Sequence, residues 1–217
     1  MYKYILTHLK MRLLWCFLVV VSGFDELKDI PSAWKGHSEF AKWIVKEHKP
    51  TLIYDLGVDY GFSTFTFALA MQDQGRVVGV DLFTGDVHTS FRNTYDYVMT
   101  LKNKLETKYP INLEIVKDDF TNVAYRVNEL IDIIHLDGLH TYEAAKHDYN
   151  MWIEFLDPNG LFLMHDTESF PGVRRVFDES PLYKVNFLHS AGLGVLSPNK
   201  DLIKRISTTF ALHHDDL

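Results

Sequence analysis

Residues 51–64 have the sequence TLIYDLGVDYGFST, which predicts a buried strand, a glycine turn and the start of a helix. Gly57 and Gly61 allow a tight turn and let a ligand approach the backbone closely. The helix that begins near Ser63 would present free N–H groups to an anionic group. The G-x-G-x-x-G spacing of dinucleotide-binding turns is absent. This stretch therefore indicates a ligand-binding turn, with a plain tight turn as the alternative.

Strand and helix patterns alternate from this stretch onward. The predicted strands are mostly continuous apolar runs, as buried parallel strands are, and comprise residues 51–56, 76–80, 112–117, 131–136 and 160–164. The helical patterns between them cover residues 63–72, 95–109, 122–129 and 141–155. This alternation predicts an α/β fold with a parallel sheet and right-handed crossovers. A further helix is expected at residues 35–48, and two further strands at residues 184–189 and 194–197.

The length of 217 residues suits one domain with a full core. The formal charge of −7, from 22 Lys and Arg against 29 Asp and Glu, lacks the basic footprint that binding to a phosphate backbone uses. Nucleic acid is therefore disfavoured as a partner. The lone cysteine, Cys16, can make neither an internal disulfide nor a thiolate metal cluster. This fits a reducing compartment, and we expect a cytoplasmic location.

An apolar run at Leu13–Val21 follows three basic residues near the N-terminus. It is similar to a short signal-peptide core, but it is too short to span a membrane and no small-x-small cleavage pattern follows it. We expect it to pack on the domain or on a partner subunit, which leaves a homo-oligomer open and predicts no firm membrane association. The predicted organisation is a hydrophobic, helical extension at residues 1–34 and one domain at residues 35–217.

Acidic residues close the second and third predicted strands. Asp81 lies about 20 residues beyond the glycine turn, where an acid can accept hydrogen bonds from ribose hydroxyls, although such residues also serve as caps. Asp118 and Asp119 follow the third strand. One of them could accept a hydrogen bond from an adenine amino group, or could cap the next helix.

Histidine and aspartate residues follow the fourth and fifth predicted strands. Asp137 ends the fourth strand, His140 comes three residues later, and His165 and Asp166 end the fifth. Neighbouring parallel strands would bring these side chains to one rim, where open α/β sheets place ligands. Carboxylates and imidazoles can hold a divalent cation, and an imidazole can act as a general base near neutral pH. The alternative is hydrogen bonding that fixes loops.

Three other polar residues lie near this rim. His135 lies inside the fourth strand, so for this residue we prefer a structural hydrogen-bonding role. Asp86 and His88 follow Asp81 in a segment that should cover the rim. They could contact a substrate or simply shape their loop.

Several strings resemble one family of class I S-adenosyl-L-methionine (SAM)-dependent methyltransferases, of the methyltransferase-24-like kind that occurs alone or fused to glycosyltransferases. They are DLGVDYGFST, VDLFTGDVHT, IDIIHLDGLHTYEAAKHDYNMW, LFLMHDT and HSAGLGVL. The resemblance runs from about Lys35 to Ser197. It implies a Rossmann-like, seven-stranded, mostly parallel sheet with helices on both faces and the last strand antiparallel.

The resemblance also implies a cofactor site. SAM would be bound by Asp55, Gly57, Gly61, Ser63 and Asp81, with Asp118 and Asp119 near the adenine. The methionine carboxylate would lie at the helix N-terminus, and Asp55 would face the ammonium group. The middle glycine common in the family is absent, and Asp59 stands in its place. The loop must then curve away from that side chain.

A more distant similarity is to metal-dependent O-methyltransferases of the catechol type. It implies a divalent cation held by Asp137, His165 and Asp166, with His140 as the general base. A histidine replaces a carboxylate of that pattern, which leaves magnesium and manganese both open.

We therefore expect a SAM-dependent methyltransferase that methylates a hydroxyl of a small molecule or sugar. The sulfonium is already an activated donor, so the protein mainly orients and deprotonates the acceptor. His140 would take the hydroxyl proton, and a metal at Asp137 would lower the pKa of that hydroxyl. The alternatives are a non-catalytic SAM-binding module, an NAD-dependent Rossmann oxidoreductase and a metal-dependent hydrolase. Transfer to nitrogen instead of oxygen also stays open.

Overall fold

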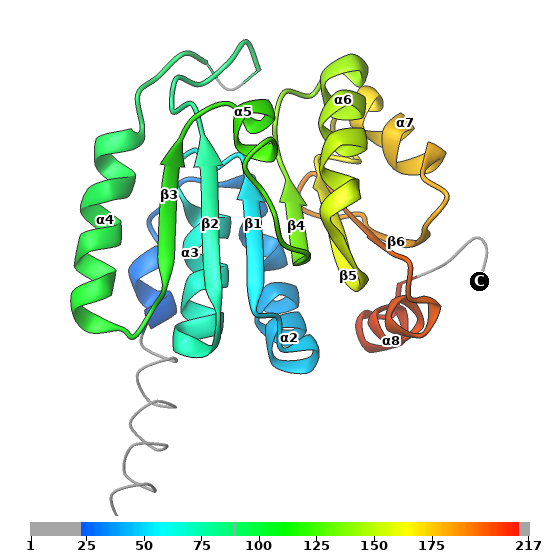
Figure 1. Cartoon of the computed structure of the whole chain (residues 1–217), viewed down its shortest axis with the longest axis horizontal. Helices are drawn as coiled ribbons and strands as arrows, with labels where there is room; N and C mark the ends of the chain where they lie inside the picture. The colour runs from blue at the N-terminus through cyan, green and yellow to red at the C-terminus, as the bar shows by residue number, and fades with distance from the viewer. Residues whose placement is uncertain (1–22, 89, 213–217) are drawn as a thin grey trace, which may run out of the picture.

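The computed structural model describes residues 23–88 and 90–212, so the apolar run at Leu13–Val21 lies outside the described residues. One seven-stranded sheet has the order β3-β2-β1-β4-β5-β7-β6 (Figure 1). Its strands are β1 (Leu52–Leu56), β2 (Arg76–Asp81), β3 (Leu113–Lys117), β4 (Ile131–Leu136), β5 (Leu156–His165), β6 (Tyr183–Phe187) and β7 (Leu193–Ser197). The first five pair in parallel, and β7 runs antiparallel to both β5 and β6. The expected Rossmann-like, mostly parallel sheet is confirmed.

Helices cover both faces of this sheet. They are η1 (Phe24–Leu27), η2 (Ala33–His37), α2 (Ser38–His48), α3 (Phe62–Met71), η3 (Gln72–Gln74), α4 (Tyr95–Lys108), α5 (Phe120–Ala124), α6 (Tyr142–Trp152), η4 (Ile153–Phe155), α7 (Pro171–Glu179) and α8 (Lys200–Phe210). One core cluster joins α2, α3, α4 and α8 to one face of the sheet, and a second joins α5, α6 and α7 to the other. Successive strand residues alternate between them: Ile53 belongs to the first cluster and Tyr54 to the second.

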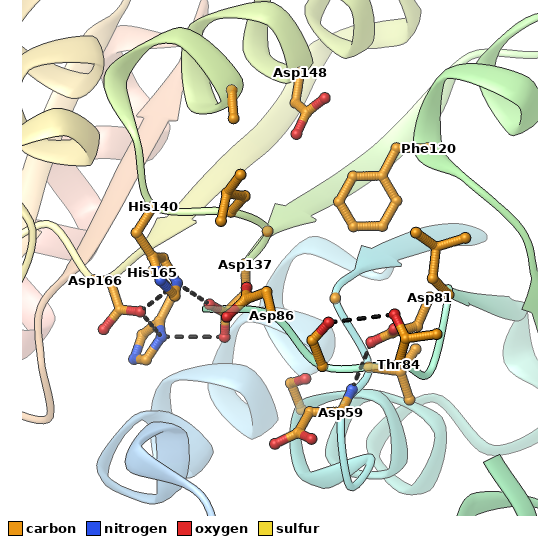
Figure 2. A pocket seen from close by; sticks show the side chains of 18 of the residues that line it. Asp59, Asp81, Thr84, Asp86, Phe120, Asp137, His140, Asp148, His165 and Asp166 are labelled. Carbon is orange, nitrogen blue, oxygen red and sulfur yellow. Dashed lines mark hydrogen bonds and ion pairs between the residues drawn. The ribbon is translucent and has the colours of Figure 1, made fainter. Parts of the chain in front are cut away.

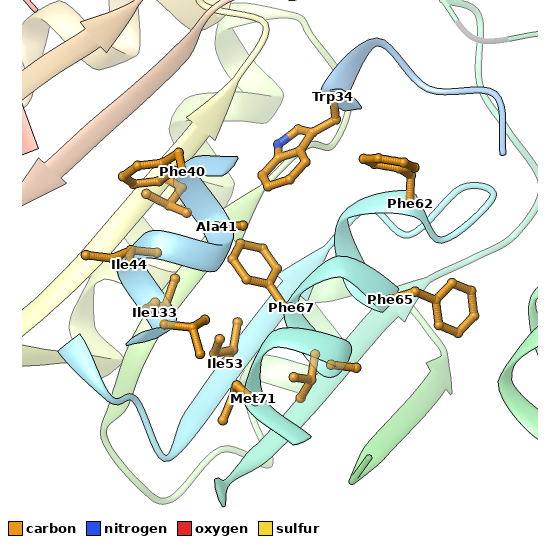
Figure 3. Packing of buried hydrophobic residues seen from close by; sticks show 14 of the residues in the cluster. Trp34, Phe40, Ala41, Ile44, Ile53, Phe62, Phe65, Phe67, Met71 and Ile133 are labelled. Carbon is orange, nitrogen blue, oxygen red and sulfur yellow. The ribbon is translucent and has the colours of Figure 1, made fainter. Parts of the chain in front are cut away.

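The folded unit begins before the boundary expected at residue 35. Leu27, Ile30 and Trp34 are almost fully buried in the same core cluster as α2 and α3. The Trp34 ring packs edge-on against Phe67 at 5.5 Å, as Figure 3 shows. Its indole N–H also donates to Nε2 of His135 at 2.9 Å. The described part of the extension, from residue 23 to residue 34, is therefore part of the domain core.

Three local predictions differ from the structure. The helix expected at residues 122–129 is the shorter α5. It starts earlier than expected, because the Asp119 side chain accepts a hydrogen bond from the Thr121 amide. The strand expected at residues 160–164 is the longer β5. Residues 157–160 form a bulge inside it, since Ile131 pairs with Leu156 and Ile133 with Leu161. Helices α7 and α8 were not predicted; α7 starts with a proline at its first position, where no N–H is needed.

Within the described residues, no helix combines the length and apolar content needed to cross a membrane.

Candidate active site

The glycine turn after β1 is the point where three strand ends meet. The Gly57 amide donates to the Val80 carbonyl at 2.9 Å, and the Asp137 amide donates to the Leu56 carbonyl at 2.8 Å. Gly57 has a φ of 107°, and a Cβ atom there would lie 1.9 Å from the Asp137 carbonyl oxygen. Only glycine can occupy this position, because the chain after β4 passes directly over it.

A cavity of about 790 Å³ opens at this edge of the sheet (Figure 2). Its lining includes nine of the residues predicted for the site: Gly57, Ser63, Asp81, Asp86, Asp119, Asp137, His140, His165 and Asp166. Gly61, with a φ of 88°, precedes α3 and lets the first turn of that helix face the same space. Asp55, Asp118 and His88 are not part of the cavity wall.

Asp55 lies behind the turn, and its side chain is completely buried. Its Oδ2 accepts hydrogen bonds from the hydroxyls of Ser63, at 2.8 Å, and Thr64. Its Oδ1 lies 2.6 Å from Nδ1 of His135. The carboxylate therefore holds the start of α3 in place, and it reaches the cavity through Ser63 instead of facing a ligand ammonium directly.

His135 has a structural role, as expected. Its Nε2 accepts the indole N–H of Trp34, so this nitrogen carries no proton, and Nδ1 must then donate to Asp55. Both ring nitrogens are used inside the fold. The ring links η2, β4 and β1 into one buried network.

Asp81 ends β2 and lines the cavity. Its Oδ2 accepts from the Asp59 amide at 2.8 Å, and its Oδ1 accepts from the Phe83 amide at 2.6 Å. Burial raises the pKa of Asp81, and the two amides oppose this rise. Each oxygen can still accept a further hydrogen bond, which makes the carboxylate a fixed acceptor for a diol.

Asp59 replaces the family's middle glycine and has a φ of 48°. Aspartate is one of the few residues that tolerate this left-handed conformation. Its carboxylate accepts two hydrogen bonds from Arg92, from Nε at 3.1 Å and from Nη2 at 2.7 Å. The Arg92 guanidinium also lies 5.2 Å from the centre of the Tyr60 ring. Asp59 thus ties the glycine turn to the segment after β2.

The two acids after β3 have different positions. Asp119 lines the cavity and caps α5, so the capping alternative holds for this residue. Asp118 lies outside the cavity lining, where its carboxylate accepts from Arg126 at 2.6 Å and from Asn122 at 3.0 Å. These bonds occupy Asp118 on the surface of the protein.

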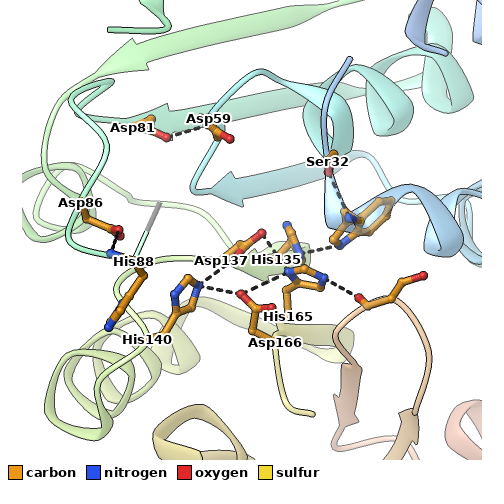
Figure 4. A network of polar contacts seen from close by, with 12 residues as sticks. Ser32, Asp59, Asp81, Asp86, His88, His135, Asp137, His140, His165 and Asp166 are labelled. Atoms are coloured by element: carbon orange, nitrogen blue, oxygen red, sulfur yellow. Dashed lines mark hydrogen bonds and ion pairs between the residues drawn. The ribbon is translucent and has the colours of Figure 1, made fainter. Parts of the chain in front are cut away.

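Asp137, His140, His165 and Asp166 form one cluster, which we call the rim (Figure 4). Nε2 of His140 lies 2.8 Å from Oδ2 of Asp166 and 3.4 Å from Oδ1 of Asp137. Nδ1 of His165 lies 3.1 Å from Oδ2 of Asp137, and its Nε2 donates to the Ser190 carbonyl at 3.0 Å. The strand ends therefore bring together all four residues predicted to lie there.

The carboxylates control the charge of both rim histidines. Burial lowers the pKa of His140, but the hydrogen bonds and charges of Asp137 and Asp166 outweigh it and raise the pKa to about 10. Burial likewise lowers the pKa of His165, and Asp137 and Asp166 raise it to about 9. Burial raises the pKa of Asp137, but His165 and His140 hold it well below its usual range. The carboxylates thus favour the charged form of both imidazoles.

The donor atoms best placed for a cation are not quite the predicted set. Asp137, His140 and Asp166 each offer one ligand atom, and these atoms lie within 4.8 Å of one another. Two carboxylates and an imidazole suit a divalent cation that tolerates nitrogen. The sequence-based set has His165 in place of His140. In the structure the Nε2 atom of His165 is occupied by Ser190, which leaves Nδ1, beside Asp137, as its one available donor.

Asp86 and His88 lie near the rim in different ways. Asp86 lines the cavity and accepts a hydrogen bond from the His88 amide at 2.8 Å. The exposed His88 ring lies 5.3 Å from the His140 ring and 5.1 Å from Phe170. Phe170 also stacks on His140 at 4.2 Å. Three rings therefore border the rim, with His88 outside the cavity lining.

Comparison with known proteins identifies the family. Residues 55–167 match the family described as "Methyltransferase domain". The chain belongs to this family of class I methyltransferases. A curated relative, the uncharacterized protein y4gI of Sinorhizobium fredii, is 31% identical over 188 residues. The match covers 82% of this chain and 20% of that protein, so the chain spans about a fifth of the relative's length.

Solved methyltransferases have the same fold as this methyltransferase domain. The SAH-bound methyltransferase PaMTH1 of Podospora anserina has a TM-score of 0.61 at 9% identity, covering 88% of this chain and 95% of that one. An O-methyltransferase of Bacillus cereus in complex with SAH has a TM-score of 0.59 at 14% identity, with coverages of 81% and 91%. At these identities the likeness establishes the class I fold.

Sequence reasoning missed several parts of the site of this methyltransferase domain. Trp34 lines the cavity, but it lies in the segment assigned to the extension. Trp34 is a large aromatic residue shortly after Pro31, and in the sequence this is only a weak sign of a core position. The Arg92 partner of Asp59 could be suspected only from the missing glycine. Phe120 and Asp148 also line the cavity, and nothing local in the sequence marks them.

The Asp59–Arg92 pair generates a prediction. We expect Arg92→Met to speed hydrogen exchange at the amides of Arg92 and Phe83 about fivefold, as loss of an ion pair worth about 1 kcal/mol would do. Asp59→Asn keeps a side chain that tolerates positive φ, so it should change exchange in the same direction but less. The measurement is hydrogen–deuterium exchange followed by mass spectrometry.

The matched control is Arg174→Met. Arg174 bonds to Glu168 and Asp178 outside the cavity, so its loss should leave exchange at Phe83 unchanged. Unchanged exchange in Arg92→Met would show that the pair does not hold this segment.

Proposed function

We propose that this methyltransferase domain transfers the methyl group of SAM to a hydroxyl oxygen of a small molecule or sugar. The observation that carries the proposal is that one cavity contains the glycine turn, Asp81 and the rim together. A site that binds an amino-acid-bearing nucleoside is thereby continuous with a site that can deprotonate an acceptor. The structural neighbours that contain bound SAH support SAM as the cofactor.

The residues present fit SAM. The volume of about 790 Å³ lies within the range of small-molecule sites. The first turn of α3 offers backbone N–H groups to a carboxylate, and Gly57 leaves the space that a Cβ atom would fill. Asp81 offers two oxygens to ribose hydroxyls. When bound, SAM supplies a methyl group on a sulfonium, which is already an activated donor.

The work left to this chain is to orient the acceptor and remove its proton. We assign to Nε2 of His140 the role of accepting the proton of the acceptor hydroxyl. The carboxylates of Asp137 and Asp166 then stabilise the imidazolium that forms. With His140 as the base, a divalent cation would be held by Asp137 and Asp166, and His165 can contribute through Nδ1, which lies beside Asp137. Such a cation would acidify a bound hydroxyl and offset the negative charge that keeps His140 protonated.

The most detailed part of the proposal is the chemical identity of the methyl acceptor. A sugar hydroxyl is favoured because the family occurs fused to glycosyltransferases, an argument from association. The relative y4gI extends well beyond the matched region, which agrees with a domain that works beside others. The chain's charge of −7 supports a small neutral acceptor over nucleic acid.

Isothermal titration calorimetry with SAM and with NADH tests which cofactor the chain binds. We expect SAM to bind with a dissociation constant well below millimolar, and NADH not to bind. Asp81→Ala should weaken SAM binding at least tenfold, because it removes charged acceptors from two ribose hydroxyls. Asp73→Ala, an exposed acid after α3, is the control and should have no effect. Tighter binding of NADH than of SAM would overturn the proposal.

Methyl transfer is tested with isotope-labelled SAM and a pool of hydroxyl-bearing acceptors. We expect chelation to lower turnover, and added Mn²⁺ or Mg²⁺ to restore it. His140→Ala should lower kcat at least 100-fold, the usual contribution of a general base, while SAM affinity changes less than twofold.

His48→Ala, at the far end of α2, is the matched control and should leave kcat unchanged. Full turnover after chelation would remove the cation from the proposal. SAM binding without transfer to any acceptor would favour a non-catalytic binding module.

A further inference from the structure

The segment between β5 and α7 begins at a rim residue and leads back to the rim. Asp166 has a φ of 65°, and its carbonyl oxygen accepts hydrogen bonds from the amides of Ser169, at 3.1 Å, and Phe170, at 3.0 Å. Helix α7 then starts at Pro171, directly after Phe170. The position of Phe170 is therefore fixed by a backbone hydrogen bond to one of the rim residues.

The Phe170 ring covers one face of the His140 imidazole. The two rings are stacked, with their centres 4.2 Å apart and their planes 15° from parallel. By comparison, the exposed His88 ring lies 5.3 Å from His140 and is tilted by 37°. A rotation of the imidazole about its Cβ–Cγ bond would drive its edge into the Phe170 ring, which resists such overlap. Phe170 lies outside the cavity lining, so it can act on the site only through His140.

The same segment also fixes the backbone of the loop that carries His140. A Cβ atom on Gly172 would lie 2.6 Å from the Tyr142 amide nitrogen and 3.0 Å from the His140 carbonyl oxygen. The start of α7 therefore lies directly on this loop, and a larger residue would push the two apart. Phe170 and Gly172 thus hold the ring and the backbone of one residue.

His140 lacks the hydrogen bond that commonly orients a catalytic histidine. Its Nε2 faces the carboxylates of Asp137 and Asp166 (Figure 4). Its Nδ1 is buried and has no hydrogen-bond partner among the residues that the structure describes. In catalytic triads a third group bonds to the second ring nitrogen and fixes the orientation of the imidazole. A half-turn of the His140 ring would replace Nε2 by a carbon atom, so packing has to do this work here.

We propose that Phe170 is the positioning residue of His140, whose ring it keeps in the plane that directs Nε2 to the rim. This inference rests on the proposed function, because it takes His140 as the base that receives the acceptor proton. A base must lie within hydrogen-bond reach of the proton that it removes. An imidazole that rotates freely would occupy the productive position for a smaller fraction of the time.

The first test compares two substitutions of Phe170 in the labelled-SAM assay, with the best acceptor of the hydroxyl-bearing pool. Phe170→Leu keeps an apolar side chain but removes the flat ring. We expect it to lower kcat about tenfold, the upper end for loss of one aromatic stack, with KM for the acceptor and SAM affinity changed less than about twofold. Phe170→Tyr keeps the ring and should retain kcat to within about twofold.

Phe155→Leu is the matched control. Phe155 is partly buried, as Phe170 is, and its ring packs edge-on against Trp152 at 5.9 Å, outside the cavity lining. Its loss should lower the thermal stability about as much as the loss of Phe170, but it should leave kcat unchanged. An equal fall of kcat in both variants would show a general loss of stability and would contradict the positioning role.

Nuclear magnetic resonance of the His140 ring gives a second readout that does not need turnover. In a histidine-labelled chain, the signals of this ring are identified by their loss in His140→Ala. We expect the ring current of Phe170 to shift the His140 ring protons upfield in the wild-type chain and in Phe170→Tyr. In Phe170→Leu these signals should move downfield and broaden, because the ring then exchanges between orientations.

The outcomes separate the two proposals. If the wild-type chain transfers a methyl group to no acceptor, the proposed function fails, and the ring signals still decide whether Phe170 holds His140. If kcat falls in His140→Ala but not in Phe170→Leu, only the present inference fails. Equal losses of kcat in Phe170→Tyr and Phe170→Leu, or unchanged His140 signals in Phe170→Leu, would likewise overturn it.

Discussion

The close approach of two backbones at Gly57 is the constraint on which the site depends. The chain after β4 passes so near this residue that a single added carbon would lie 1.9 Å from the Asp137 carbonyl oxygen. The same approach places the Asp137 amide on the Leu56 carbonyl and the Gly57 amide on the Val80 carbonyl. The ends of β1, β2 and β4 are thereby held together. Any group that binds above the turn then lies beside the rim.

A buried network transmits this constraint to the rest of the core. Trp34 donates to His135, His135 donates to Asp55, and Asp55 accepts from Ser63 at the start of α3. Because every member is buried, loss of one partner would leave another unsatisfied, which is costly in a medium of low dielectric. Residues before β1 thus help to hold the helix whose N-terminus faces the cavity.

The rim has a different character. His140 and His165 share Asp137 and Asp166, and these carboxylates favour the charged form of both imidazoles. The pairing offsets part of the desolvation cost of these groups, and loss of one partner would leave another charge unpaired. A cation and an acceptor would enter a site whose charges are already paired. Their binding has to displace protons, and metal binding at such sites commonly does so.

Most of the fold could be predicted from local patterns. The strands β1 to β4 are short apolar runs closed by a glycine or an acid, and their ends were placed to within about two residues. The rim residues were also predicted, because parallel neighbours end at one edge of a sheet. Tertiary packing decided the rest. Leu27, Ile30 and Trp34 join the core although no periodic pattern surrounds them, and α7 and α8 were not recognised in the sequence.

The remaining site residues depend on contacts across the fold. Asp59 is visible as a missing glycine, but its partner Arg92 is distant in sequence and becomes evident only from the structure. Asp55 has the position of a ligand-facing acid, yet His135 and two hydroxyls take up its oxygens. Asp148 lines the cavity from the middle of α6, where nothing local in the sequence marks it. Residue type and spacing alone therefore do not distinguish these roles.

A crystal structure of the chain with S-adenosylhomocysteine tests the central claim most directly. We expect the homocysteine carboxylate at the first turn of α3, above Gly57, and both ribose hydroxyls on Asp81. The sulfur should point toward Asp137 and His140. A ligand bound outside this cavity, or bound with its ribose away from Asp81, would contradict the proposed geometry and with it the assignment of the rim as a methyl-transfer site.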